Sequence, residues 1–138
     1  MRVLLSIKPE YAEKILSGEK RFEFRKVSFE NETVNSVVIY ATKPVGKVVG
    51  EFEIVEIYRD KPSKIWAKTK KFAGIDKVFF DEYYEGRDVA VAIGVGAVQK
   101  YQEPFDLSEL GAGITPPQSF RYLDAGSANL MQRELEFA

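Results

Sequence analysis

The sequence predicts an α+β fold, a small mixed or antiparallel β-barrel with short helices at its mouth. Two observations lead to this class. Hydrophobic periodicity gives the order strand, helix, three strands, two helices, two strands, and several short strands with few helices are typical of small barrels. The length of 138 residues fits a single domain with a real core. We assign residues 1–123 to this domain and residues 124–138 to a C-terminal tail, in which a short helix is expected.

The predicted elements follow from local periodicity and from turn residues. They are, in order, a strand at 3–8, a helix at 9–17, strands at 22–27, 36–42 and 48–58, helices at 61–74 and 75–86, and strands at 88–101 and 118–123. Pro9 suits the first turn of the first helix, and Gly18 is expected to end it. Asp76 is expected to cap the third helix. A slip in the alternation near 54–56 predicts a β-bulge.

The strand predicted at 88–101 has one bulky face and one almost bare face. The bare face carries Ala90, Ala92, Gly94 and Gly96. A bare strand face indicates that another element or a ligand approaches closely. We favour packing of another element.

Residues 18–26, GEKRFEFRK, carry the densest functional signal. Two phenylalanines alternate with charges of both signs, and the phenylalanines are expected to face the core. Glu23 and Arg25 then share the opposite face of the strand, because strand side chains alternate, and Lys20 lies at the start of the strand. These charges form either an ordinary solvated face or a site for an anionic ligand.

The composition excludes several classes of site. The chain has no cysteine and no histidine, which removes disulfides, thiolate metal sites and catalysis by either residue. The sequence lacks the D-x-D pattern that would indicate a magnesium site, and we expect no metal and no cofactor. The longest apolar run, at 89–98, is about half of what a membrane helix requires. We therefore expect a cytoplasmic protein that does not bind membranes.

Charge is unevenly spread along the chain, although the net charge is −1. Residues 59–71 hold six lysines and arginines against one aspartate. A weakly acidic chain can therefore present a basic face to an anionic partner. The alternative is that Lys64, Lys68 and Lys71 are simply the solvated side of an amphipathic helix.

The signature residues resemble those of a known family. The G-x-K-x-x-E-x-R signature of ASCH domains, which belong to the PUA-like superfamily, is matched by Gly18, Lys20, Glu23 and Arg25. The preceding LLSIKPEYAEKILSGEK and the later IYATKPVGKVVGEFEI and PPQSFRYL are similar to blocks of bacterial and archaeal members. The resemblance covers residues 1–123 and implies a small β-barrel with a cleft into which the signature residues point.

The resemblance also implies a function. Family members have been proposed to bind RNA, a nuclease activity has been described in the family, and some small bacterial members are amidohydrolases that act on N4-acetylcytidine through a lysine, a threonine and a glutamate. Lys20 falls on that lysine position, but Glu23 stands at the threonine position and residues 72–78 show no counterpart of the glutamate. We expect binding of nucleic acid, namely single-stranded RNA or a nucleoside. The alternative is an enzyme, either an amidohydrolase acting on a modified nucleoside or a ribonuclease.

The candidate binding residues combine cations, hydrogen-bonding groups and aromatic rings. Arg25 can hold a phosphate or a base edge through two N–H groups, whereas Lys20 supplies a point charge. Tyrosines offer faces on which the bases of single-stranded RNA stack. The set is Lys8, Lys20, Glu23, Arg25, Tyr40, Lys43, Tyr84, Gln118, Ser119 and Arg121. In an enzyme, Lys20 is expected to be the general base, with its pKa lowered by burial, and Glu23 to position water or protonate the leaving group.

Structural roles compete with these assignments. Glu23 and Arg25 can form an ion pair with each other, and Tyr40 can be a core residue. One of Tyr83 and Tyr84 is expected to pack against the core. A third hypothesis is a protein-interaction module in which the C-terminal tail forms a homodimer.

Overall fold

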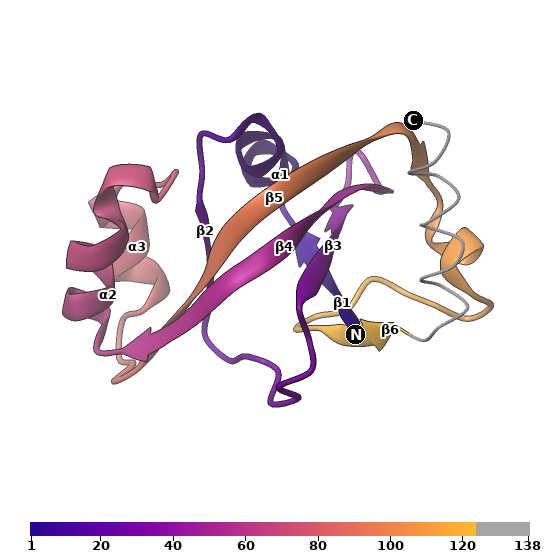
Figure 1. The fold of residues 1–138 in the computed structure, drawn as a ribbon. Helices are drawn as coiled ribbons and strands as arrows, with labels where there is room; N and C mark the ends of the chain where they lie inside the picture. The colour runs from indigo at the N-terminus through magenta and orange to yellow at the C-terminus, as the bar shows by residue number, and fades with distance from the viewer. Residues whose placement is uncertain (124–138) are drawn as a thin grey trace.

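The computed structural model describes residues 1–123 and shows a mixed α+β fold with one six-stranded sheet (Figure 1). The strands are β1 (Arg2–Ile7), β2 (Phe22–Arg25), β3 (Ser36–Ala41), β4 (Lys47–Asp60), β5 (Ala90–Phe105) and β6 (Arg121–Leu123). The helices are α1 (Pro9–Ser17), α2 (Pro62–Thr69) and α3 (Lys77–Tyr83), and 3₁₀ turns lie at Lys70–Phe72 and Leu107–Leu110. The helix and the dimer contact predicted for the tail at 124–138 lie outside the described residues.

The strands are ordered β2-β5-β4-β3-β1-β6 across the sheet. All neighbours pair antiparallel except β1 and β3, which are parallel. A parallel pair needs a crossover connection, and the segment that contains α1 and β2 supplies it. Within residues 1–123, β2 and β6 are the outer strands and no ladder joins them. Closure of the sheet into the predicted barrel therefore stays a prediction.

The long pair of β4 and β5 confirms two predictions about packing. The pairing of the two strands shifts register between Phe52 and Ile57, which is the bulge predicted near 54–56. The bare face of β5 meets this irregular stretch, because a Cβ atom on Gly94 would lie 3.1 Å from the backbone oxygen of Glu56. The glycine thus admits the backbone of the neighbouring strand rather than a ligand.

The helix ends follow the predicted signals in part. α1 ends at Gly18, whose φ of 87° suits glycine. Asp76 caps α3 by accepting a hydrogen bond from the backbone N–H of Phe79 at 2.8 Å. The helix predicted at 61–74 is shorter, since α2 ends at Thr69 and a 3₁₀ turn follows. The Thr69 hydroxyl donates to the carbonyl of Ile65 at 2.8 Å, a contact that bends helices.

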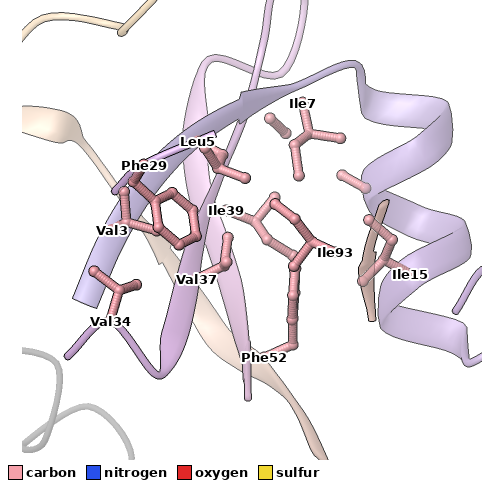
Figure 2. Packing of buried hydrophobic residues seen from close by; sticks show 12 residues of the cluster. Val3, Leu5, Ile7, Ile15, Phe29, Val34, Val37, Ile39, Phe52 and Ile93 are labelled. Atoms are coloured by element: carbon pink, nitrogen blue, oxygen red, sulfur yellow. The ribbon is translucent and has the colours of Figure 1, made fainter. Parts of the chain in front are cut away.

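The main core lies between the sheet and α1. Figure 2 shows side chains of β1, β3, β4, β5 and α1 meeting in this cluster, among them Leu5, Ile39 and Ile15. A second cluster beneath α2 and α3 fixes β2, because Phe24 packs edge-to-face on Phe80 with ring centroids 5.3 Å apart. Among residues 1–123, no helix is both long enough and apolar enough to cross a membrane.

Candidate functional site

A pocket of about 220 Å³ lies between β2, the end of β1, α1 and α3. Signature residues from β2 form one wall, and aromatic side chains from the two helices form the others. The lining residues are Ser6, Ile7, Lys8, Tyr11, Lys20, Glu23, Phe24, Arg25, Ile75, Phe79 and Tyr83. The pocket therefore brings three cations, one carboxylate and several rings to one opening.

Lys20 is a lysine with a nearly fully buried side chain. Only 1% of the residue is exposed, and its Nζ donates to the carbonyl of Ala73 at 2.5 Å. The same Nζ lies 4.6 Å from the ring centroid of Phe24 and 5.6 Å from that of Tyr11, which are favourable positions for a cation. Burial lowers the pKa of Lys20 from 10.5 to about 8, although Glu23 opposes the change. Roughly one Lys20 in ten is then neutral at pH 7, the form that a general base requires.

The segment between α2 and α3 encloses this lysine. The backbone N–H of Arg21 donates to the carbonyl of Phe72 at 2.9 Å, which places the segment beside the start of β2. Gly74 leaves room for the lysine stem, because a Cβ atom there would lie 2.6 Å from Cβ and Cγ of Lys20. The φ of Gly74 is 69°, so other residues would also be strained there. A glycine outside the signature is thus needed to bury the signature lysine.

Arg25 joins β2 to two other parts of the chain. Its Nη1 donates to the carbonyl of Ser6 in β1 at 3.3 Å, and its Nη2 donates to the carbonyl of Ser119 at 2.6 Å. Its Nη1 also lies 3.5 Å from the carboxylate of Glu23, so the two side chains form the ion pair that was considered as their structural role. Much of the guanidinium is therefore occupied by the protein itself.

Glu23 is a second buried ionisable group in the same pocket. It is 6% exposed, and burial raises the pKa of its carboxyl against the opposing effects of Lys20, Arg25 and the backbone N–H of Phe24. The carboxyl of Glu23 therefore holds a proton more readily than usual, while Lys20 releases one more readily. Two groups shifted in this way are suited to act as acid and base.

Ser6 places an unpartnered hydroxyl in the pocket. Its Oγ is buried and has no hydrogen-bond partner within residues 1–123. Buried polar atoms without a partner are rare in native proteins. The Ser6 hydroxyl is therefore a buried group whose hydrogen-bonding capacity the described residues leave unused.

Aromatic rings form the remaining walls. The rings of Tyr11 and Phe79 meet edge-to-face with centroids 5.8 Å apart, and Phe79 stacks on Tyr83 at 6.4 Å with an angle of 10° between the rings. Burial raises the pKa of the Tyr83 hydroxyl, so Tyr83 stays neutral and can only act as a packing surface or a hydrogen-bonding group.

The structure separates the predicted tyrosines from the pocket. Tyr40 lies in a core cluster with Leu4 and is 6% exposed. Tyr84 is buried as well, and its hydroxyl donates to the carbonyls of Arg25 and Val91 at 2.9 and 3.1 Å. Tyr84 therefore holds β2 in place, and its neighbour Tyr83 lines the pocket instead.

The remaining predicted residues divide into two groups. Lys8, Lys20, Glu23 and Arg25 line the pocket together. The other four do not line it: Lys43, Gln118 and Arg121 are exposed elsewhere, and Ser119 contributes its backbone carbonyl to Arg25.

Some lining residues were not predicted as site residues. They are Ser6, Ile7, Tyr11, Ile75 and Phe79, together with Phe24, which was expected only to face the core. For Ser6 a signal exists, because it lies two residues before Lys8 and strand side chains two apart share a face. For Tyr11 and Phe79 no local signal separates pocket lining from core packing. Within the described residues, no group of three acidic side chains is arranged to hold a metal ion.

The chain belongs to the ASCH domain family, whose model matches residues 5–104. An ASCH domain-containing ribonuclease of Zymomonas mobilis is 30% identical over 123 residues, which are 87% of this chain and 82% of that protein. The large ribosomal subunit protein uL22 of Ureaplasma parvum is 36% identical over 122 residues, which are 88% of this chain. This chain spans only 39% of that relative's length.

Solved structures agree with this assignment. The crystal structure of ASCH from Zymomonas mobilis matches with a TM-score of 0.89 at 27% identity, covering 96% of this chain and 94% of that one. The N-terminal domain of McrB from Staphylothermus marinus matches with a TM-score of 0.60 at 11% identity, covering 96% and 93%. The second likeness is one of fold alone.

Lys20 is expected to make the free energy of unfolding rise with pH between about 8 and 10.5. The unfolded chain keeps the Lys20 proton up to its ordinary pKa of 10.5, whereas the folded chain releases it near 8. In this window the unfolded state binds more protons, so raising the pH favours the folded state. Urea titrations between pH 7 and 10 should show the wild type gaining about 2 kcal/mol relative to Lys20→Met.

The matched control is Lys8→Met, which changes an exposed lysine of the same pocket. If the free energy of unfolding depends on pH in the same way for the wild type and for Lys20→Met, Lys20 is not buried as a cation in solution.

Arg25→Lys is expected to lower the free energy of unfolding by about 3 kcal/mol, because one ammonium group cannot reach both carbonyls and the carboxylate of Glu23. Arg121→Lys, an exposed change on β6, should stay within about 0.5 kcal/mol. Urea unfolding at pH 7 measures both. A loss for Arg25→Lys no larger than that for Arg121→Lys contradicts the bridging role.

Proposed function

We propose that this ASCH domain binds RNA and takes one nucleotide of a single-stranded segment into the pocket. The observation that carries the proposal is the meeting of a nearly buried cation, Lys20, with the unpartnered hydroxyl of Ser6 in one small pocket. Burying both groups costs free energy, which the Ala73 carbonyl and nearby rings offset in part for Lys20 but which no partner among residues 1–123 offsets for Ser6. An anionic ligand with a hydrogen-bonding group offsets that cost.

The pocket has chemistry for each part of a nucleotide. Lys20 and the exposed Lys8 supply charge for a phosphate. The rings of Tyr11, Phe79 and Tyr83 give the pocket apolar walls against which a base can pack. Glu23 can exchange hydrogen bonds with an exocyclic amine of that base. The volume of about 220 Å³ is below the ~300 Å³ of typical drug-sized sites. A single base or phosphate fits such a pocket better than a folded RNA element does.

The named relatives support an RNA ligand. The Zymomonas mobilis protein is called a ribonuclease, and the match covers 82% of its length. RNA is thus the ligand class with support from both the pocket and a relative.

Lys20→Met is expected to weaken binding of a labelled single-stranded RNA at least tenfold, because it removes the buried charge. Ser6→Ala should weaken binding about fivefold, the loss of one hydrogen bond. The control is Lys43→Met, an exposed lysine that does not line the pocket, and it should bind like the wild type. Fluorescence anisotropy at several salt concentrations measures all four proteins, and affinity should fall with salt.

Two outcomes would overturn the proposal. One is an absence of RNA binding by the wild type at low salt. The other is equal affinity for the wild type, Lys20→Met and Ser6→Ala, which would place the RNA elsewhere.

A second candidate function is cleavage of the bound RNA. The observation in its favour is that the pKa of Lys20 is lowered to about 8 and the pKa of Glu23 is raised within one pocket. Neutral Lys20 would take the proton of a ribose 2′-hydroxyl, whose oxygen attacks the adjacent phosphorus. The bond from phosphorus to the 5′-oxygen breaks, and the protonated carboxyl of Glu23 gives its proton to that oxygen. The products are a 2′,3′-cyclic phosphate and a 5′-hydroxyl.

Hydrolysis of N4-acetylcytidine has less support from the geometry. Residues 72–78 contribute the Ala73 carbonyl and the side chain of Ile75 to the pocket region. The carboxylate of this segment, on Asp76, caps α3 instead. Glu23 also stands where the amidohydrolases have threonine. The pocket therefore lacks two of the three groups of that reaction.

If Lys20 is the general base and Glu23 the general acid, the cleavage rate should pass through a maximum and fall at high pH, because the active form has a neutral Lys20 and still holds a proton on Glu23. Gel assays of RNA cleavage from pH 6 to 9 measure the profile, and Lys20→Met should abolish the activity. Cleavage that persists in Lys20→Met contradicts this role. Turnover of N4-acetylcytidine in a parallel assay would favour the amidohydrolase reading instead.

A further inference from the structure

A row of exposed cations lies on α2 and the 3₁₀ turn after it, outside the pocket. We call it the basic strip and define it as Arg21, Lys64, Lys68 and Lys71 together with the rings of Tyr58 and Phe72. All four cations are exposed. In sequence the three lysines are spaced by four and three residues, which places them on one side of a helical segment.

Aromatic rings fix the positions of three of these cations. The Nζ of Lys68 lies 4.6 Å from the ring centroid of Tyr58. The guanidinium of Arg21 lies 4.4 Å from the ring of Phe72, and the Nζ of Lys71 lies 5.6 Å from the same ring. Cations over rings are held without losing their charge. The strip therefore presents fixed positive charges, and its rings serve the cations rather than bases.

The charge of the strip is not cancelled by carboxylates. The ion pairs within residues 1–123 engage other cations, and none involves a residue of the strip. The one acidic residue of the segment at 59–71, Asp60, accepts the backbone N–H of Lys61 at the start of α2. Burial raises the pKa of the Tyr58 hydroxyl, and the neighbouring carboxylate of Glu56 raises it further. The four exposed cations thus face solvent without an ion pair to any carboxylate of residues 1–123.

The strip is continuous with the pocket. Arg21 of the strip directly follows Lys20 of the pocket. The carbonyl of Phe72 accepts the backbone N–H of Arg21, and the next carbonyl, that of Ala73, accepts the Nζ of Lys20. The same few residues therefore support the pocket lysine on one side and the strip on the other.

We propose that the basic strip binds the phosphate backbone of the RNA that flanks the nucleotide in the pocket. The inference rests on the proposed function and adds a second contact of a different kind. Fixed cations without open ring faces bind phosphates and read no bases. The strip therefore adds affinity that does not depend on sequence, and only for RNA long enough to leave the pocket.

The test compares a short and a long RNA. A trinucleotide occupies the pocket alone, whereas an oligonucleotide of about 15 nucleotides, near the upper site size of small single-strand binding domains, also reaches the strip. The strip variant is Lys68→Gln with Lys71→Gln, neither of which lines the pocket. The control variant is Lys43→Gln with Lys100→Gln. It removes the same charge at the opposite end of the long β4–β5 pair from α2 (Figure 1).

For the long RNA, the strip variant should bind about 25-fold more weakly at 0.1 M salt, and its log–log salt slope should be shallower by about 1.4. These values follow from two phosphate contacts of about 0.7 each, with equal affinity at 1 M salt. For the trinucleotide, the strip variant should bind like the wild type. The control variant should match the wild type with both RNAs.

The possible failures are distinguishable. If the wild type binds RNA but the strip variant keeps its affinity and slope for the long RNA, the strip is not an RNA contact and the pocket proposal stands. If the wild type binds neither RNA, both proposals fail. A further experiment is sedimentation with anionic lipid vesicles. If the strip variant loses binding to vesicles but keeps its binding to RNA, the strip contacts a membrane surface and the inference is overturned.

Discussion

The guanidinium of Arg25 connects parts of the chain that no ladder joins. β2 is an outer strand and pairs only with β5, yet Arg25 reaches the carbonyls of Ser6 and Ser119 on the far side of the sheet order. Carbonyl oxygens are the partners that a planar fork of N–H groups can hold together. Together with the β5 ladder and the packing of Phe24 and Tyr84, this side chain positions β2, and with it Lys20 and Glu23.

Two opposing electrostatic effects, burial and the attraction between opposite charges, set the protonation of Lys20 and Glu23. A buried lysine and a buried glutamate stabilise each other's charges, while burial acts against both. Neither effect is complete, so each group lies closer to neutrality than it would in water. This balance requires that the segment around Ala73 and Gly74 keep water away from the lysine, and the missing side chain of Gly74 allows that segment to lie against the lysine stem.

The sequence predicted features that depend on nearby residues. The end of α1 at Gly18, the cap at Asp76 and the bulge in β4 are local, and the structure has all three. The sequence placed Tyr84 among the binding residues, whereas in the structure Tyr84 is buried and Tyr83 lines the pocket, because adjacent residues at a helix end point in different directions. Only the packing of α3 on β2 decides which one is buried.

Burial of the site residues was also hard to predict, because it depends on packing between segments that are far apart in the sequence. An alternating strand indicates one wet face, but β2 is covered on both faces. Phe24 packs under α3, and Glu23 lines the pocket and is buried there. The rings of Tyr11 and Phe79 come from separate helices and contact each other only in the folded chain. No spacing in the sequence therefore predicts that they line the same pocket.

The pairing of β1 with β6 sets the order in which the molecule can be completed. The first strand of the chain pairs with the last described strand, and contacts between such distant segments form late. During synthesis, which proceeds from the N-terminus, Arg25 leaves the ribosome long before Ser119 does. Until then the guanidinium lacks one of its partners, so a nascent chain carries the signature without a finished pocket.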